Sequence, residues 1–152
     1  MHIAIGSDHG GYDLKQTITE FLNTEGHQVL DLGVHSPESV DYPDIAAPVA
    51  RAIAAGEAQR GILICGTGIG VSMSANKVVG VRAALCTDCY MARMAREHND
   101  AQILCLGGRV LGAGSALDIV QVFLDSEFQG GRHARRVQKI NALDKQDGIS
   151  NR

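Results

Sequence analysis

Five short, almost entirely apolar runs alternate with longer amphipathic segments along this chain, and that alternation restricts the fold more than any other feature. Such runs are typical of parallel strands covered on both faces, because a half-exposed strand would alternate polar and apolar residues. The predicted strands are Ile3–Ser7, Gln28–Leu32, Gly61–Cys65, Val81–Leu85 and Ile103–Leu106. Their alternation with helices indicates an α/β fold: a doubly wound, Rossmann-like, five-stranded parallel sheet with helices on both faces.

The segments between and after these runs have the periodicity of helices. The predicted helices are Tyr12–Glu25, Pro43–Ala55, Val71–Lys77, Asp88–Glu97, Gly112–Ser126 and Arg132–Leu143. Gly26 and Gly56 stop the first two, because glycine readily adopts the left-handed conformation that ends a helix. With 152 residues and no repeat or linker, the chain is predicted to form one domain over 1–152, with a flexible polar tail at 144–152.

Composition and charge argue against several classes of partner. The formal net charge is −3 and aromatic residues make up 4% with no tryptophan, so neither a basic field nor a stacking surface for nucleic acid is expected. No apolar run approaches the roughly 20 residues of a membrane-spanning helix. The chain begins with strand-like residues rather than a signal peptide, and its four cysteines fit a reducing compartment. We therefore expect a cytoplasmic protein with no membrane partner.

The third apolar run ends in Cys65 and is followed by a loop with alternating glycines, Gly66-Thr67-Gly68-Ile69-Gly70. Such a loop at the start of a helix lets backbone N–H groups converge on an anion. A strand-end cysteine is more often a small buried apolar residue than a reactive one, but a core strand does not need three glycines in five positions. Val71 stands where a dinucleotide fingerprint needs glycine, so the pattern predicts an anion smaller than a nucleotide.

Other polar residues also follow predicted strands, where ligands of open α/β sheets bind. Asp8-His9 follows the first strand and Arg109 the last, so an acid–imidazole pair, the thiol and an arginine are expected to share one rim. Asp8 has a second interpretation, as the cap of the next helix. No metal-binding cluster is needed to explain this set.

Three further groups have both a structural and a functional interpretation. His98 ends a helix, where the helix dipole favours a cationic imidazole. Arg132 and Arg136 share one face at the start of the last helix, where they form either a solvated surface or an anion site. Cys86 and Cys89 form a C-x-x-C motif, but without a second pair of ligands a buried strand-end cysteine is favoured over zinc or redox chemistry.

Taken in order, these motifs resemble those of the type B ribose-5-phosphate isomerases and the related galactose-6-phosphate isomerase subunits. The resemblance covers essentially the whole chain. The segments that carry it are Asp8-His9 with Leu14-Lys15, Ser39-Val40-Asp41-Tyr42-Pro43, Cys65–Gly70, Ala75-Asn76-Lys77, Gly80-Val81-Arg82-Ala83-Ala84, His98-Asn99-Asp100, Arg109, and Gly130-Gly131-Arg132-His133-Ala134-Arg135-Arg136.

The resemblance implies interconversion of an aldose phosphate and a ketose phosphate without a metal or other cofactor. It implies that Cys65 is the base that moves a proton between C1 and C2, and that His98 assists opening of the furanose ring. The glycine loop, Gly66 to Gly70, would hold the enediolate. The residues implied to contact the sugar are Asp8, His9, Tyr42 and Asn99, and those implied to hold the phosphate are His9, Arg109, Arg132 and Arg136.

The resemblance further implies a homodimer, or a dimer of dimers, with active sites at the subunit interface. Some relatives have a glutamate just after the last loop glycine, where this chain has Val71, so it resembles the cysteine type. Two alternatives remain: an isomerase of a six-carbon sugar phosphate, such as galactose 6-phosphate or allose 6-phosphate, and a non-catalytic sugar-phosphate-binding protein. Cys65 and His98 in one chain favour a self-sufficient, homo-oligomeric isomerase.

Overall fold

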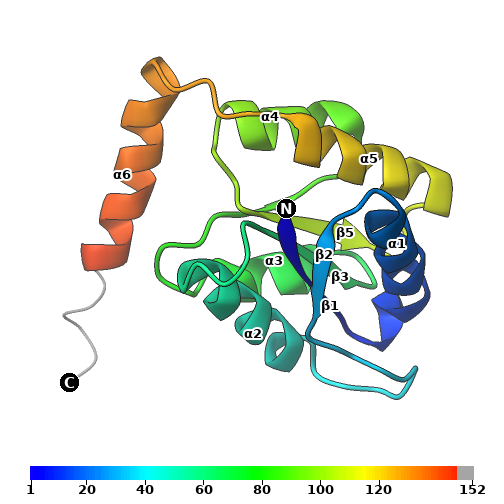
Figure 1. Ribbon diagram of the computed structural model, residues 1–152. Helices are drawn as coiled ribbons and strands as arrows, with labels where there is room; N and C mark the ends of the chain where they lie inside the picture. Colours follow the sequence, from blue (N-terminus) through cyan, green and yellow to red (C-terminus); the bar gives the residue numbers. More distant parts are fainter. Residues whose placement is uncertain (147–152) are drawn as a thin grey trace, which may run out of the picture.

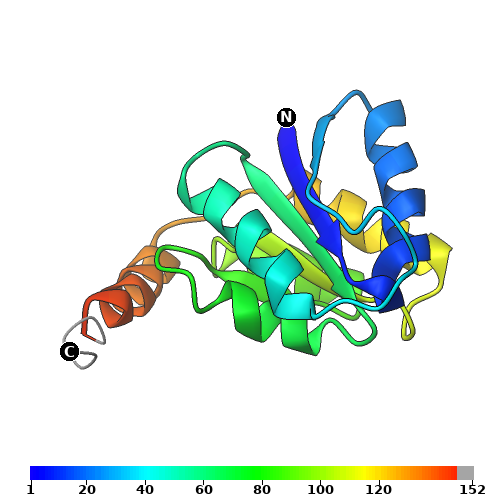
Figure 2. The ribbon, with the colours of Figure 1, turned by 90° about the horizontal axis from the view of Figure 1, so that it is seen from below.

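The computed structural model describes residues 1–146, which form a five-stranded parallel sheet with helices on both faces (Figures 1 and 2). The predicted doubly wound fold is confirmed. The strands are β1 (His2–Ser7), β2 (Gln28–Asp31), β3 (Arg60–Cys65), β4 (Ala83–Leu85) and β5 (Ile103–Gly107), in the spatial order β2-β1-β3-β5-β4. The helices are the 3₁₀ turn η1 (His9–Gly11), α1 (Tyr12–Thr24), α2 (Tyr42–Ala54), α3 (Ile69–Ala75), α4 (Cys89–Glu97), α5 (Ala113–Asp125) and α6 (Arg132–Gln146).

Two apolar layers lie on opposite faces of the sheet. Because successive strand residues point to opposite faces, Ile62 and Ile64 pack with the apolar residues of α1, α4 and α5. Leu63 and Cys65 pack on the other face, with α2 and α3. Figure 1 shows this arrangement, with α4 and α5 on one side of the sheet and α2 and α3 on the other. Burial on both faces explains why the strands are apolar along their whole length.

The helix α6 stands to one side of this three-layer body (Figure 1). Polar contacts connect it to the segment before β4: Arg82 Nη1 donates to Asn141 Oδ1 at 2.8 Å, and the Gly80 N–H donates to Asp144 Oδ2 at 2.8 Å. The predicted tail at 144–152 began too early, since Asp144 to Gln146 continue α6; its other residues lie outside the described part of the chain. None of the helices within residues 1–146 is long and apolar enough to cross a membrane.

The strand predicted over Val81–Leu85 is shorter in the structure, where β4 begins at Ala83. The reason is that a side chain, rather than the backbone of a neighbouring strand, accepts the hydrogen bond from the residue before Ala83. The Arg82 N–H donates to Gln102 Oε1 at 2.7 Å instead of to a backbone carbonyl, so the regular ladder starts one residue later. This position at the edge of the sheet could not be deduced from an apolar run.

The helix predicted over Val71–Lys77 lies two residues earlier, at Ile69–Ala75. It begins inside the glycine loop because Gly68, at φ +81°, turns the chain into the first helical residue. It ends where Asn76 exchanges two side-chain hydrogen bonds with the backbone of Ala83, each 2.9 Å. The other predicted elements agree with the structure to within one residue at each end, apart from β4 and α6.

Candidate active site

The carboxyl edge of the sheet brings together the loops that follow β1, β3 and β5. The three strands end at the same height in the sheet, since the register pairs Ser7 with Ile64 and Cys65 with Gly107. The chain leaves β3 for the α3 face, whereas it leaves β1 and β5 for the opposite face. The loops diverge at β3, which is the kind of switch point where α/β sheets form ligand crevices.

These three loops lie close enough for direct backbone hydrogen bonds, and glycines make that approach possible. The Gly108 N–H donates to the Cys65 carbonyl at 2.8 Å, and the Arg109 N–H to the Gly66 carbonyl at 3.0 Å. A side chain at Gly108 would place its Cβ 2.6 Å from the Gly10 carbonyl oxygen. The glycines after β1 and β5 therefore have a structural role, since they allow the loops to approach closely enough to form one rim.

Cys65 lies at the centre of this rim, with 4% of its surface exposed. Its Sγ accepts a hydrogen bond from the Gly68 N–H at 3.1 Å. Directly after this donor, the positive φ of Gly68 turns the chain into α3. A backbone donor directed at sulfur can stabilise negative charge there, which a proton-accepting thiolate requires.

Asp8 and His9 lie next to this loop, with different partners. Asp8 Oδ1 accepts the N–H groups of Gly10 at 2.9 Å and Gly11 at 3.2 Å, so its role as a cap is confirmed. His9 is half-buried and its Nδ1 accepts the Val40 N–H at 3.3 Å. An Nδ1 that accepts leaves Nε2–H as the donor of the neutral ring.

Tyr42 and Arg109 complete the rim. Tyr42 is the first residue of α2, and its ring covers Gly70, where an added Cβ would lie 2.6 Å from the ring. Arg109 is exposed and its Nη1 would lie 3.2 Å from a Cβ at Gly66. Within residues 1–146 no carboxylate pairs with Arg109. The rim thus carries an arginine whose charge is available to an anion.

His98 and Asn99 lie away from this rim, at the opposite edge of the sheet. The helix α4 begins at the carboxyl edge, where Asp88 Oδ1 caps it by accepting the Met91 N–H. It then runs back for nine residues, about 13 Å, to the opposite edge of the sheet. His98 follows its last turn and stacks on His133 of α6, with ring centroids 4.0 Å apart and planes 10° apart.

Two arginines that the sequence analysis did not single out hold the turn after His98. Arg82 donates from Nε to the Asn99 carbonyl at 3.1 Å and from Nη2 to the Asp100 carbonyl at 2.9 Å. The buried Arg96 donates to Asp100 Oδ1 at 2.9 Å. The spacing of Arg96 and Asp100, four residues apart, is the signal that could have identified this pair.

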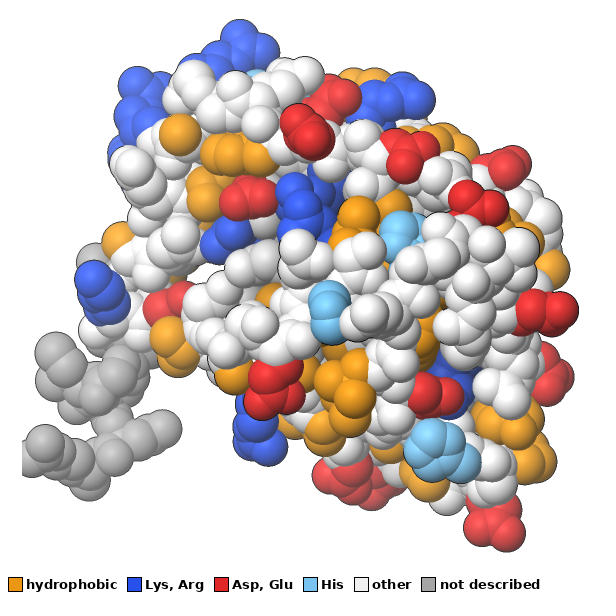
Figure 3. Space-filling view, in the orientation of Figure 1, with side chains coloured by type: hydrophobic (Ala, Val, Ile, Leu, Met, Phe, Trp, Pro, Cys, Tyr) orange, Lys and Arg blue, Asp and Glu red, His pale blue; other side chains and the backbone are white. Residues whose placement is uncertain are grey.

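The amino-terminal half of α6 forms a cationic surface around the histidine pair. Figure 3 shows the blue Lys and Arg side chains gathered at the upper left, where α6 begins. The exposed cationic residues there are Arg132, Arg135, Arg136 and Lys139. Burial, then the charges of His98, Arg132 and Arg136, lower the pKa of His133 below its ordinary value. Arg132 and Arg136 thus accompany His98, not Cys65, within one chain.

The C-x-x-C motif lies outside both groups. Burial, reinforced by the Asp88 carboxylate, raises the pKa of Cys86 to about 12, so its thiolate is scarce at neutral pH. The four cysteines are free, and residues 1–146 hold no group of three or more His, Cys, Asp or Glu side chains that could bind a metal ion. The structure supports the buried strand-end interpretation of Cys86.

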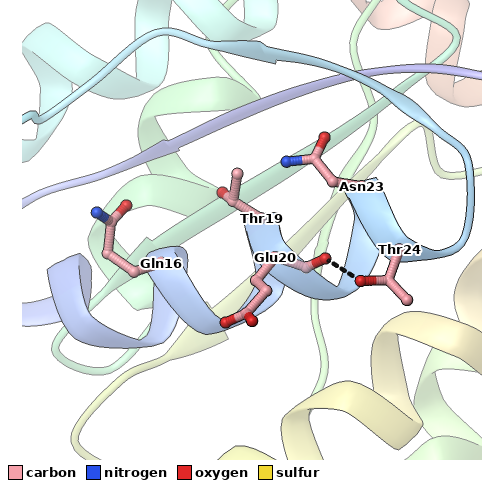
Figure 4. Close-up of a pocket in the computed structure, with 5 residues that line it drawn as sticks. All are labelled: Gln16, Thr19, Glu20, Asn23 and Thr24. Carbon is pink, nitrogen blue, oxygen red and sulfur yellow. Dashed lines mark hydrogen bonds between the residues drawn. The ribbon is translucent and has the colours of Figure 1, made fainter.

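A separate hollow lies on α1 (Figure 4). Its lining is Gln16, Thr19, Glu20, Asn23 and Thr24, and the Thr24 hydroxyl donates to the Glu20 carbonyl at 3.0 Å. The lining of this hollow has no cationic side chain and includes the carboxylate of Glu20. It therefore does not compete with the rim as a site for an anionic substrate.

Comparison with known proteins supports a relation over nearly the whole chain. Residues 3–140 match the model of a family described as Ribose/Galactose Isomerase. The solved structure of Clostridium thermocellum ribose-5-phosphate isomerase B is 61% identical, with a TM-score of 0.95 and coverage of 96% of this chain and 99% of that chain. Escherichia coli ribose-5-phosphate isomerase B is 46% identical (93% and 95% covered). D-Erythrulose-4-phosphate isomerase of Pectobacterium atrosepticum is 47% identical (97% of each).

Proposed function

Since the chain belongs to the ribose/galactose isomerase family, we propose that it interconverts ribose 5-phosphate and ribulose 5-phosphate through an enediolate. The observation that carries the proposal is the Gly68 N–H directed at Cys65 Sγ at 3.1 Å, inside a glycine loop at the sheet's switch point. Relatives from Clostridium thermocellum and Escherichia coli, named ribose-5-phosphate isomerase B, support this substrate.

Cys65 is the proposed base. Its thiolate removes the proton from C2 of the open-chain aldose, and the C–H electron pair forms the C1–C2 double bond while negative charge moves to the carbonyl oxygen. The hydroxyl proton on O2 passes to O1, so that the negative charge moves to O2. The thiol then returns its proton to C1 as O2 becomes the carbonyl oxygen, which gives the ketose. The loop of Gly66 to Gly70 supplies N–H groups at the start of α3, which suit an enediolate oxygen because they are already oriented before charge develops.

His98 is proposed to assist ring opening by moving a proton between the ring oxygen and the anomeric hydroxyl. Arg109, Arg132 and Arg136, with His9, are proposed to hold the phosphate, since guanidinium groups match phosphate oxygens in pairs. Asp8, Tyr42 and Asn99 are proposed to contact the sugar. Binding of the phosphate at a distance from the reacting carbons orients C1 and C2 against Cys65.

These roles need both groups of residues at one substrate, which supports a homodimer with shared active sites. In one chain, the length of α4 separates His98 from the rim that holds Cys65. A second copy can bring its own His98, Asn99, Arg132 and Arg136 to that rim. Each of two sites would then take its base from one chain and its ring-opening histidine from the other.

The activity is tested by incubating the purified protein with ribose 5-phosphate and following the ketose. Cys65→Ala is expected to abolish turnover while the variant still binds the sugar phosphate, and a chelator is expected to leave the wild-type rate unchanged. Near-normal turnover by Cys65→Ala would contradict the assignment of the base. Faster turnover of D-erythrulose 4-phosphate or allose 6-phosphate would instead change the substrate and leave the reaction type intact.

The shared site is tested by mixing two inactive variants, Cys65→Ala and Arg132→Ala, under conditions of subunit exchange. If Arg132 acts on the partner's Cys65, a hybrid dimer carries both changes in one site and none in the other. The mixture should therefore recover activity in one site of each hybrid. No recovery after proven exchange would place Arg132 and Cys65 of a site on the same chain.

A further inference from the structure

We infer that the carboxylate of Asp31, held in place by the buried Lys15, positions His9 for substrate through the segment that joins β2 to α2. This inference rests on the proposed function, because it treats His9 as a substrate-binding residue. Asp31 and Lys15 are not proposed to touch the substrate, so both are positioning residues. The connection runs through three consecutive sets of hydrogen bonds.

The first contact is an ion pair between α1 and the end of β2. Lys15 has none of its surface exposed, and its Nζ lies 2.7 Å from both Oδ1 and Oδ2 of Asp31. A buried ion pair is weak evidence for stability, because a well-packed apolar pair of similar volume often stabilises a fold equally well. The role of this pair is therefore better judged from its further contacts than from stability alone.

The second set of contacts joins Asp31 to the end of β1. Asp31 Oδ1 also accepts the Gly33 N–H at 2.9 Å, and Gly33 has a φ of +102° that favours glycine. The Gly33 carbonyl accepts the Ser7 N–H at 2.8 Å, and the Ser7 carbonyl accepts the Val34 N–H at 2.8 Å. The carboxylate thus fixes the start of the segment against Ser7, two residues before His9.

The third contact reaches the histidine. At the other end of the same segment, the Val40 N–H donates to His9 Nδ1 at 3.3 Å. This bond orients the ring and selects the tautomer with its proton on Nε2. Nε2–H is then available to a phosphate or sugar oxygen. Without the Asp31 anchor, the segment can move and the Val40 donor is no longer held at His9.

Two double variants test whether the oxygen of Asp31 is the anchor. Lys15→Met/Asp31→Asn removes the ion pair and keeps an amide oxygen for the Gly33 N–H, whereas Lys15→Met/Asp31→Leu removes both. The Leu variant is expected to raise KM for ribose 5-phosphate about tenfold, as expected for one lost hydrogen bond, with a smaller change in kcat. The Asn variant is expected to keep KM within about twofold of wild type, because the anchor remains.

Leu22→Ala is the matched control, because Leu22 is a fully buried residue of the same helix. It should lower the unfolding midpoint without changing KM, which separates lost stability from lost positioning. Val40→Pro removes the donor to His9 and leaves the ion pair intact, so it should raise KM as the Leu variant does. Unchanged KM in either the Leu variant or Val40→Pro overturns the inference, as does an equal loss in the Asn variant.

A readout that does not use ribose 5-phosphate keeps the two proposals distinguishable. Nitrogen chemical shifts of His9 report its tautomer, and amide exchange at Val40 reports the donor. Both should be wild-type in the Asn variant and altered in the Leu variant. If the wild type does not turn over ribose 5-phosphate, the proposed function fails while these measurements still decide whether Asp31 positions His9.

Discussion

Gly68→Ala is the substitution for which the structure makes the sharpest quantitative prediction. Gly68 has a φ of +81°, a region that an alanine enters at a cost of about 1–2 kcal/mol. A Cβ at this position would also lie 2.8 Å from the Leu106 carbonyl carbon and 2.6 Å from Leu85 Cδ1. The Leu85 side chain can rotate, but the contact at Leu106 is with the backbone of β5, an inner strand of the sheet, so the loop itself must shift.

Gly56→Ala separates these two effects. Gly56 has a similar φ of +75°, but nothing lies within 4 Å of a Cβ there. We therefore expect Gly56→Ala to cost about 1–2 kcal/mol from backbone conformation alone. Gly68→Ala should cost a further ~1–3 kcal/mol, the usual range for overpacking. That difference corresponds to a midpoint lower by roughly 2–12 °C for a domain of this size.

The assay is denaturant unfolding of both variants at one protein concentration, so that any association affects them equally, together with turnover of ribose 5-phosphate. A shifted loop moves the Gly68 N–H away from Cys65, so turnover should fall about 10²–10³-fold in Gly68→Ala, the loss expected of one electrostatic donor. Gly56→Ala should keep wild-type turnover. Equal stability of the two variants would refute the close approach of the loop to β5.

The proposed roles of His98 and Arg109, and the shifted pKa values of His133 and two cysteines, can each be tested separately. His98→Asn should be partly rescued by acyclic substrate analogues, whereas equal loss on cyclic and acyclic substrates would contradict a ring-opening role. The pKa of His133 is lowered in the folded protein, so near pH 6.5 the unfolded chain binds more protons than the folded one. The free energy of unfolding should therefore rise with pH just below and through 6.5. Measured by unfolding at several pH values, this rise should be flatter in His133→Gln. Cys86 and Cys105, whose pKa values are raised by burial, should resist alkylation at pH 8 until the protein is unfolded, as judged by peptide mass spectrometry. Arg109→Lys should raise KM about tenfold, because lysine lacks the planar fork that fits phosphate; an unchanged KM would remove Arg109 from the phosphate site.

The sequence allowed prediction of the sheet and its rim because both depend on local patterns. Apolar runs identify buried parallel strands, and the residues after them lie at one edge whatever the strand order. Details that depend on which residue a polar side chain contacts could not be predicted from the sequence. Gln102 shortens β4 and Asn76 ends α3, and neither contact follows from composition or periodicity. The Lys15–Asp31 pair was missed for the same reason: a lysine in a helix is usually a surface residue.

The separation of His98 from Cys65 follows from the fold class itself. In a parallel sheet every helix after a strand returns the chain to the edge where the next strand begins. A residue after the last turn of α4 therefore faces the amino edge, while Cys65, at the end of β3, faces the carboxyl edge. No rotamer spans the length of α4. If both residues act on one substrate, the second must come from another copy. The helix α6 stands off the body and carries Arg132 and Arg136 beside the histidine pair, so the same copy would bring these proposed phosphate-binding arginines with it.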